Sequence, residues 1–154
     1  MARLLQIFGF LSVLLRGASL TFQSLTVGGV IFLFFVLRNF SDDSEKIRSS
    51  CLSWLRRFAL ALVAIQISYL VTNSLILMES AQISLAEISG ANFVLAGALG
   101  IAASLTIIVL WMGTRAGSAN TLLFPAAAIV ASSVLTSHAM ARLEYRLSLV
   151  FVTA

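Results

Sequence analysis

The residues with the clearest potential for chemistry are one histidine and two methionines, each at the end of a long apolar run. His138 is the only histidine in the 154-residue chain, and Met140 follows it two positions later. Met78 closes another apolar run. Imidazole nitrogen and thioether sulfur are soft ligands that suit copper, and thioether sulfur favours Cu(I) in particular. The sequence therefore offers His138, Met140 and Met78 as candidate metal ligands, if the fold brings them together.

Four uncharged apolar runs must position these residues. They cover residues 17–37, 58–78, 91–112 and 121–140. A helix of this length is roughly 30 Å long, which matches the hydrocarbon core of a bilayer. Hydrophobic residues make up 60% of the chain and charged residues only 10%, against about 25% charged in a soluble domain. We predict an all-α fold, a polytopic transmembrane helical bundle with four spans plus the start of a fifth.

The flanks of these runs divide the chain into three segments. Residues 1–16 are predicted to form an N-terminal interfacial segment in which Arg16 extends to the outer headgroups. An extension of the first helix and a cleaved signal peptide are the alternatives. Residues 17–146 form the four-helix transmembrane domain. Residues 147–154 are apolar but too few to span, so we expect the start of a truncated fifth helix.

Charges in the loops predict how the chain crosses the membrane. Residues 38–57 carry five basic side chains, whereas residues 79–92 carry none and two glutamates. The positive-inside rule places the first loop in the cytoplasm and the second outside. Two crossings later, His138 is expected at the outer face, on the same side as Met78. The net charge of +4 is thus explained by orientation and headgroup contact, and nucleic acid is not an expected partner.

Polar and small residues within the spans indicate how the helices meet. Each polar residue must find a partner or line a cavity, and we expect interhelical hydrogen bonds, with a transport path as the alternative. The polar residues are Gln23, Gln66 and Asn73. Small residues permit close approach of helices. They are Gly28 and Gly29, then Ala96, Gly100 and Ser104, then Ala128, Ser132 and Thr136.

The sequence predicts a protein that is not an enzyme. It contains no glycine-rich phosphate loop, nucleophile elbow or histidine–carboxylate cluster. No charged residue falls within the four runs, which argues against a proton relay. One histidine also cannot supply both axial ligands of a b-type haem within one chain.

Two stretches resemble a known family. Residues 16–32 contain an arginine, a Gly-Gly pair and an aromatic-rich end, and residues 135–142 read Leu-Thr-Ser-His-Ala-Met-Ala-Arg. Both are similar to elements of the copper resistance protein D family (CopD/PcoD-like inner-membrane proteins), in its N-terminal half. The resemblance implies a bacterial inner-membrane protein that binds periplasmic copper for import or resistance, with His138 as a ligand. Met140 and Met78 are added from the topology.

The resemblance also sets the expected partners. The family continues into further helices with more histidine, so the missing C-terminal helices or a periplasmic copper-binding protein would supply further ligands. The lipid bilayer and a copper ion complete the expected partners. Two alternatives stay open: a non-enzymatic membrane scaffold or assembly subunit without metal, and a b-type cytochrome-like electron-transfer subunit that shares haem with a partner helix.

Overall fold

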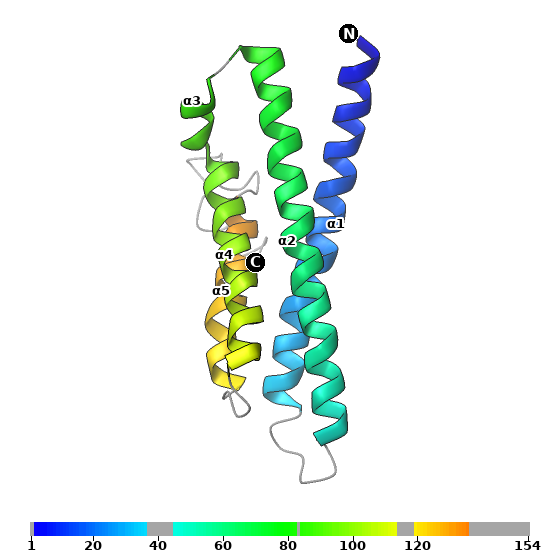
Figure 1. Ribbon diagram of the computed structural model, residues 1–154, viewed down its shortest axis with the longest axis vertical. Helices are drawn as coiled ribbons and strands as arrows, with labels where there is room; N and C mark the ends of the chain where they lie inside the picture. The colour runs from blue at the N-terminus through cyan, green and yellow to red at the C-terminus, as the bar shows by residue number, and fades with distance from the viewer. Residues whose placement is uncertain (1, 37–44, 83, 114–118, 136–154) are drawn as a thin grey trace, which may run out of the picture.

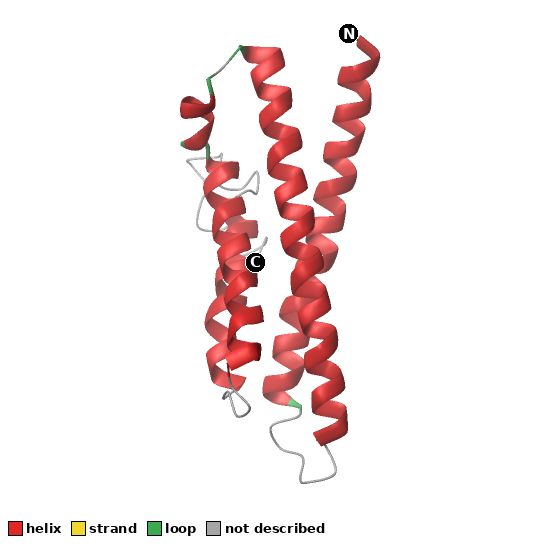
Figure 2. Ribbon diagram, viewed as in Figure 1, coloured by secondary structure: helices red, strands yellow, loops and turns green. Residues whose placement is uncertain are grey.

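Each of the four apolar runs forms the body of a helix. The computed structural model describes residues 2–36, 45–82, 84–113 and 119–135. Within them lie α1 (Ala2–Phe35), α2 (Glu45–Ala81), the short α3 (Leu85–Ser89), α4 (Asn92–Gly113) and α5 (Ala119–Leu135). The described part of the chain contains no strand (Figure 2). The predicted all-α helical bundle is confirmed.

Three of these helices are long and apolar enough to cross a membrane. The qualifying segments are Gly9–Phe35 in α1, Lys46–Ala81 in α2 and Asn92–Leu110 in α4. α5 is apolar over Thr121–Leu135 and shorter. The chain is therefore a multi-pass membrane protein. The end of the fourth predicted span, residues 136–140, and the predicted fifth run, residues 147–154, lie outside the described residues.

Two helices begin earlier than their apolar runs. α1 starts at Ala2 and continues without a break past Arg16, so residues 2–16 belong to the same helix as the first predicted span; whether they lie at the membrane interface stays a prediction. α2 starts at Glu45, and residues 45–57 lead directly into the second span. Both stretches can form a helix by their local sequence. Neither contains proline, and their Arg, Lys and Gln residues are good helix formers.

The helices form an antiparallel ring. In Figure 1, α1 and α4 run in one direction and α2 and α5 in the other. α2 packs on α1 and α4, and α5 packs on the same two helices. This order is that of an up-and-down bundle with short connections. α3 lies in the connection between α2 and α4 and touches both.

Apolar packing is concentrated toward one end of the bundle. It joins the second halves of α1 and α4 to the first half of α2 and to α5 up to Ile129. The buried residues are Val30, Leu33, Leu55, Ala59, Leu62, Ala103, Ile107, Ile108, Leu122, Ala126 and Ile129. Helix contacts in lipid depend on such close packing, because lipid tails are as apolar as the side chains. The polar residues of the spans, Gln23, Gln66 and Asn73, lie toward the other end of the bundle.

Small residues allow the close approach of α2 and α4. Ala96, Gly100 and Ser104 are all buried on α4, as the sequence predicted. A Cβ atom at Gly97 would lie 2.7 Å from Cδ2 of Leu70 on α2. Gly28 differs, because a Cβ atom there would meet nothing within 4 Å. Of the Gly-Gly pair, only Gly29 therefore faces a neighbouring helix.

The short helix α3 is a feature that the hydrophobic pattern does not predict. Ser84 is its N-cap, and its hydroxyl accepts a hydrogen bond from the backbone N–H of Glu87. The Glu87 carboxylate in turn accepts from the backbone N–H of Ser84 at 2.9 Å. This reciprocal pair is a capping box, and its Ser-x-x-Glu spacing is visible in the sequence.

Candidate functional site

The predicted copper ligands are only partly within the described residues. Met78 lies near the end of α2 and is partly exposed. His138 and Met140 lie outside the described residues, so their geometry stays a prediction. Among the described residues, no group of three or more His, Cys, Asp or Glu side chains could hold a metal ion. Cys51 is a free, partly buried thiol in the first part of α2.

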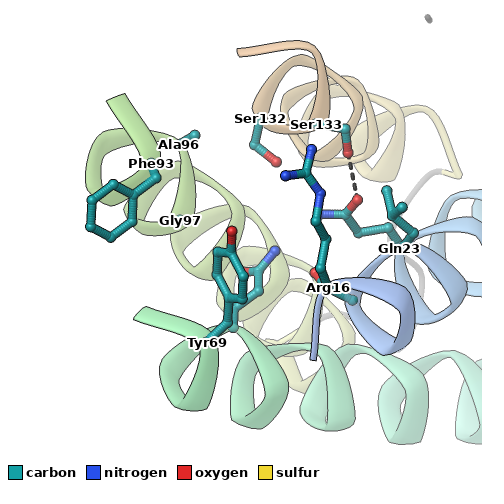
Figure 3. Close-up of a pocket in the computed structure, with 11 residues that line it drawn as sticks. Arg16, Gln23, Tyr69, Phe93, Ala96, Gly97, Ser132 and Ser133 are labelled. Carbon is teal, nitrogen blue, oxygen red and sulfur yellow. Dashed lines mark hydrogen bonds between the residues drawn. The ribbon is translucent and has the colours of Figure 1, made fainter. Parts of the chain in front are cut away.

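The described residues instead line a partly open cavity of about 230 Å³ between α1, α2, α4 and α5, with both polar and apolar side chains in its wall. It lies toward the end of the bundle opposite the apolar core. Its polar lining consists of Arg16, Ser19, Gln23, Gln66, Tyr69, Ser132 and Ser133. Leu20, Phe93, Ala96 and Gly97 complete the wall (Figure 3).

Helical spacing brings these residues together. Arg16, Ser19 and Gln23 follow one another at three and four positions and so share one face of α1. Gln66 and Tyr69 are three apart and share a face of α2. These spacings are visible in the sequence. Which faces of the four helices oppose each other is not, because that depends on the packing of the ring.

Two of the three polar residues within the spans form the expected interhelical hydrogen bonds. The hydroxyl of Ser133 on α5 donates to Oε1 of Gln23 on α1 at 2.5 Å (Figure 3). The hydroxyl of Ser12 on α1 donates to Oδ1 of Asn73 on α2 at 3.0 Å. The amide of Asn73 also donates to the backbone carbonyl of Tyr69 at 2.8 Å. For Gln23 and Asn73, interhelical bonding is confirmed.

Gln66 is the exception. Its side chain is only 5% exposed, and its Oε1 atom has no hydrogen-bond partner among the described residues. The carboxamide lies directly over Gly100 of α4, where an added Cβ atom would come within 2.5 Å of Nε2. A buried acceptor without a donor costs about 1–3 kcal/mol, so native structures rarely keep one without a reason. Gln66 therefore places a buried acceptor in the cavity wall that has no donor among the described residues.

Arg16 is an exposed residue of α1. Figure 3 shows its side chain reaching from α1 toward Ser132 and Ser133 of α5. The sequence predicts that Arg16 extends to the outer headgroups, and its place relative to a membrane stays a prediction.

The cavity and Met78 occupy different levels of the bundle. Tyr69 lines the cavity, and Met78 follows it by nine residues on α2, a rise of roughly 13 Å. Met78 therefore lies beyond the cavity, toward the end of α2. Comparison of the chain with protein-family models, with curated proteins and with solved structures finds no match. The chemical character of each site is therefore inferred from its own residues.

Proposed function

We propose that this chain is a copper-handling protein of the bacterial inner membrane, which binds periplasmic copper at the outer end of its helical bundle for import or resistance. The observation that carries the proposal is the direction of two helices. α2 and α5 both run toward the same end of the bundle (Figure 1). Met78 lies in the last turns of α2, and His138 follows the end of α5 by three residues.

The ligand chemistry also favours a copper site at this end of the bundle. His138, Met140 and Met78 would offer one imidazole and two thioethers, a soft set that favours copper over hard cations. Glu79 is adjacent to Met78 and exposed, so its carboxylate would attract a cation and orient a neighbouring ligand. The resemblance of residues 16–32 and 135–142 to the copper resistance protein D family supports the choice of metal. A partner or further helices would complete the ligand set.

Copper content of the purified protein tests this function. We expect bound copper in the wild type, none in His138→Ala and reduced amounts in Met78→Leu and Met140→Leu. Met112→Leu is the matched control, because α4 ends at Gly113 and runs opposite to α2. Met112 therefore lies at the other end of the bundle, and its substitution should leave the copper content unchanged. Equal copper in the wild type and His138→Ala would remove His138 from the mechanism.

The same preparation separates the two alternatives. A scaffold or assembly subunit would bind negligible copper in every variant, the wild type included. A b-type cytochrome-like subunit would show a Soret band in the membrane-extracted complex, and that band would weaken in His138→Ala. Copper without a Soret band is the result that the proposal requires.

A further inference from the structure

The cavity between α1, α2, α4 and α5 has a chemistry that the copper site does not use. Among the described residues that line it, Arg16 carries the one charge, and none is acidic. The guanidinium faces hydroxyl groups of Ser132 and Ser133 (Figure 3). A guanidinium presents a planar fork of N–H donors that matches the oxygens of a phosphate or carboxylate. The cavity therefore favours an anionic oxygen group.

Gln66 adds a second requirement. Its Oε1 atom is a buried acceptor without a partner among the described residues, and Gly100 leaves the space in which its carboxamide sits. An anion alone would not satisfy this oxygen, because an anion brings further acceptors. An N–H or O–H donor on the occupant would satisfy this oxygen directly, without an intervening water.

The size and setting of the cavity restrict the source of such a group. Its volume of about 230 Å³ is roughly one and a half times that of a ~150 Å³ cavity that holds benzene. A phosphate with a short amine or alcohol arm fits this size. In a bundle of apolar helices, phospholipid headgroups are the most abundant phosphates.

We propose that this cavity binds a phosphoester that carries a hydrogen-bond donor, with the phosphate on Arg16 and the donor on Oε1 of Gln66. The phosphoester comes either from a lipid headgroup or from a small solute, and the two sources share this chemistry. The proposal is independent of copper binding, because it involves none of His138, Met140 and Met78.

Headgroups with and without a donor provide the test. The ammonium of ethanolamine has N–H donors, whereas the trimethylammonium of choline has none. The full chain in detergent is titrated with phosphatidylethanolamine and phosphatidylcholine in one arm, and with phosphoethanolamine and phosphocholine in the other. We expect the ethanolamine compound to bind roughly tenfold more tightly in at least one arm, since it satisfies a buried acceptor that choline leaves unpaired.

The two arms identify the source, since preference in the lipid arm alone indicates a headgroup and preference in the soluble arm alone indicates a solute. Gln66→Leu should remove the preference for ethanolamine, and Arg16→Gln should weaken both compounds. Arg57→Gln is the matched control, because Arg57 is exposed on α2 and stacks on Trp54 at 5.0 Å, away from the cavity residues. Equal affinity of the wild type for the two headgroups, or no binding in either arm, would overturn the proposal without any variant. Neither result would alter the copper prediction.

Discussion

Gly97 offers the sharpest test of how α2 and α4 pack. A Cβ atom at Gly97 would lie 2.7 Å from Cδ2, 3.0 Å from Cδ1 and 3.0 Å from Cγ of Leu70. Cγ is involved as well as both methyl groups, so rotation about χ2 of Leu70 cannot relieve the overlap; either χ1 of Leu70 changes against its packing, or α2 and α4 separate. Overpacking of this kind costs about 1–3 kcal/mol. Gly97→Ala should therefore destabilise the bundle.

Gly28→Ala supplies the reference for this prediction. Its new Cβ atom would meet nothing within 4 Å, so only the reduced freedom of the unfolded chain changes, which stabilises by about 0.4–1 kcal/mol. The difference between the two variants isolates the steric cost and should be about 1–3 kcal/mol, or roughly 5–150-fold in the unfolding equilibrium. Equilibrium unfolding in mixed micelles, followed by circular dichroism, measures it. Equal stability of the two variants would refute the close contact.

Gly100→Ala should fall between these two. Its Cβ atom would meet Nε2 and Oε1 of Gln66 at 2.5 and 2.9 Å, which are the far end of a flexible side chain beside a cavity. The carboxamide can move into that space, so we expect a smaller loss of stability than for Gly97→Ala. A larger loss would show that the cavity gives Gln66 no room.

Two further predictions concern hydrogen bonds. The first is the bond from Ser12 to Asn73. A double-mutant cycle on Ser12→Ala and Asn73→Ala should give a coupling energy of about 0.6 kcal/mol, the average for interhelical hydrogen bonds in membranes. Ser68→Ala is the control, because the Ser68 hydroxyl donates to a carbonyl of its own helix, and it should show no coupling to Asn73. The backbone N–H and the hydroxyl of Ser84 hold the pKa of Glu87 below its ordinary value, so the α3 cap is fully present above the pKa of the unfolded chain and is lost as the pH falls through the lowered folded value. The protection factor for amide exchange at position 87, taken relative to the unstructured peptide at each pH, measures this opening. In Glu87→Gln, whose side chain does not titrate, the protection factor should not fall with pH in this way; the same acid response in both would contradict the cap.

The sequence predicted where the helices lie along the chain better than which residues of neighbouring helices contact each other. Uncharged runs of about 20 residues identify the spans, because hydrocarbon thickness and backbone hydrogen bonding leave few alternatives. The start of α1 at Ala2 was harder to predict, since an arginine at position 16 is compatible with either a break or a continuous helix. Ser84 and Glu87 carried a signal for α3 that hydrophobic periodicity does not detect.

The cavity could be anticipated only in part. The spacing of Arg16, Ser19 and Gln23 predicts a shared polar face on α1, but no sequence rule places Gln66 over Gly100 or Ser133 beside Gln23. Those contacts join residues more than 30 positions apart, and they depend on the rotation of each helix in the ring. Helix rotation is set by the sum of all packing contacts rather than by any local motif.

The apolar core lies toward one end of the bundle and the cavity toward the other, and this arrangement has a consequence for the dynamics of the protein. Local opening of a protein costs least where apolar contacts are fewest. Val30, Leu62, Ile107 and Ile129, one on each long helix, are fully buried in the apolar core, so the core holds all four helices together. We therefore expect the helices to separate more readily around the cavity than around the core. Exchange of any occupant of the cavity would then not require unfolding of the bundle.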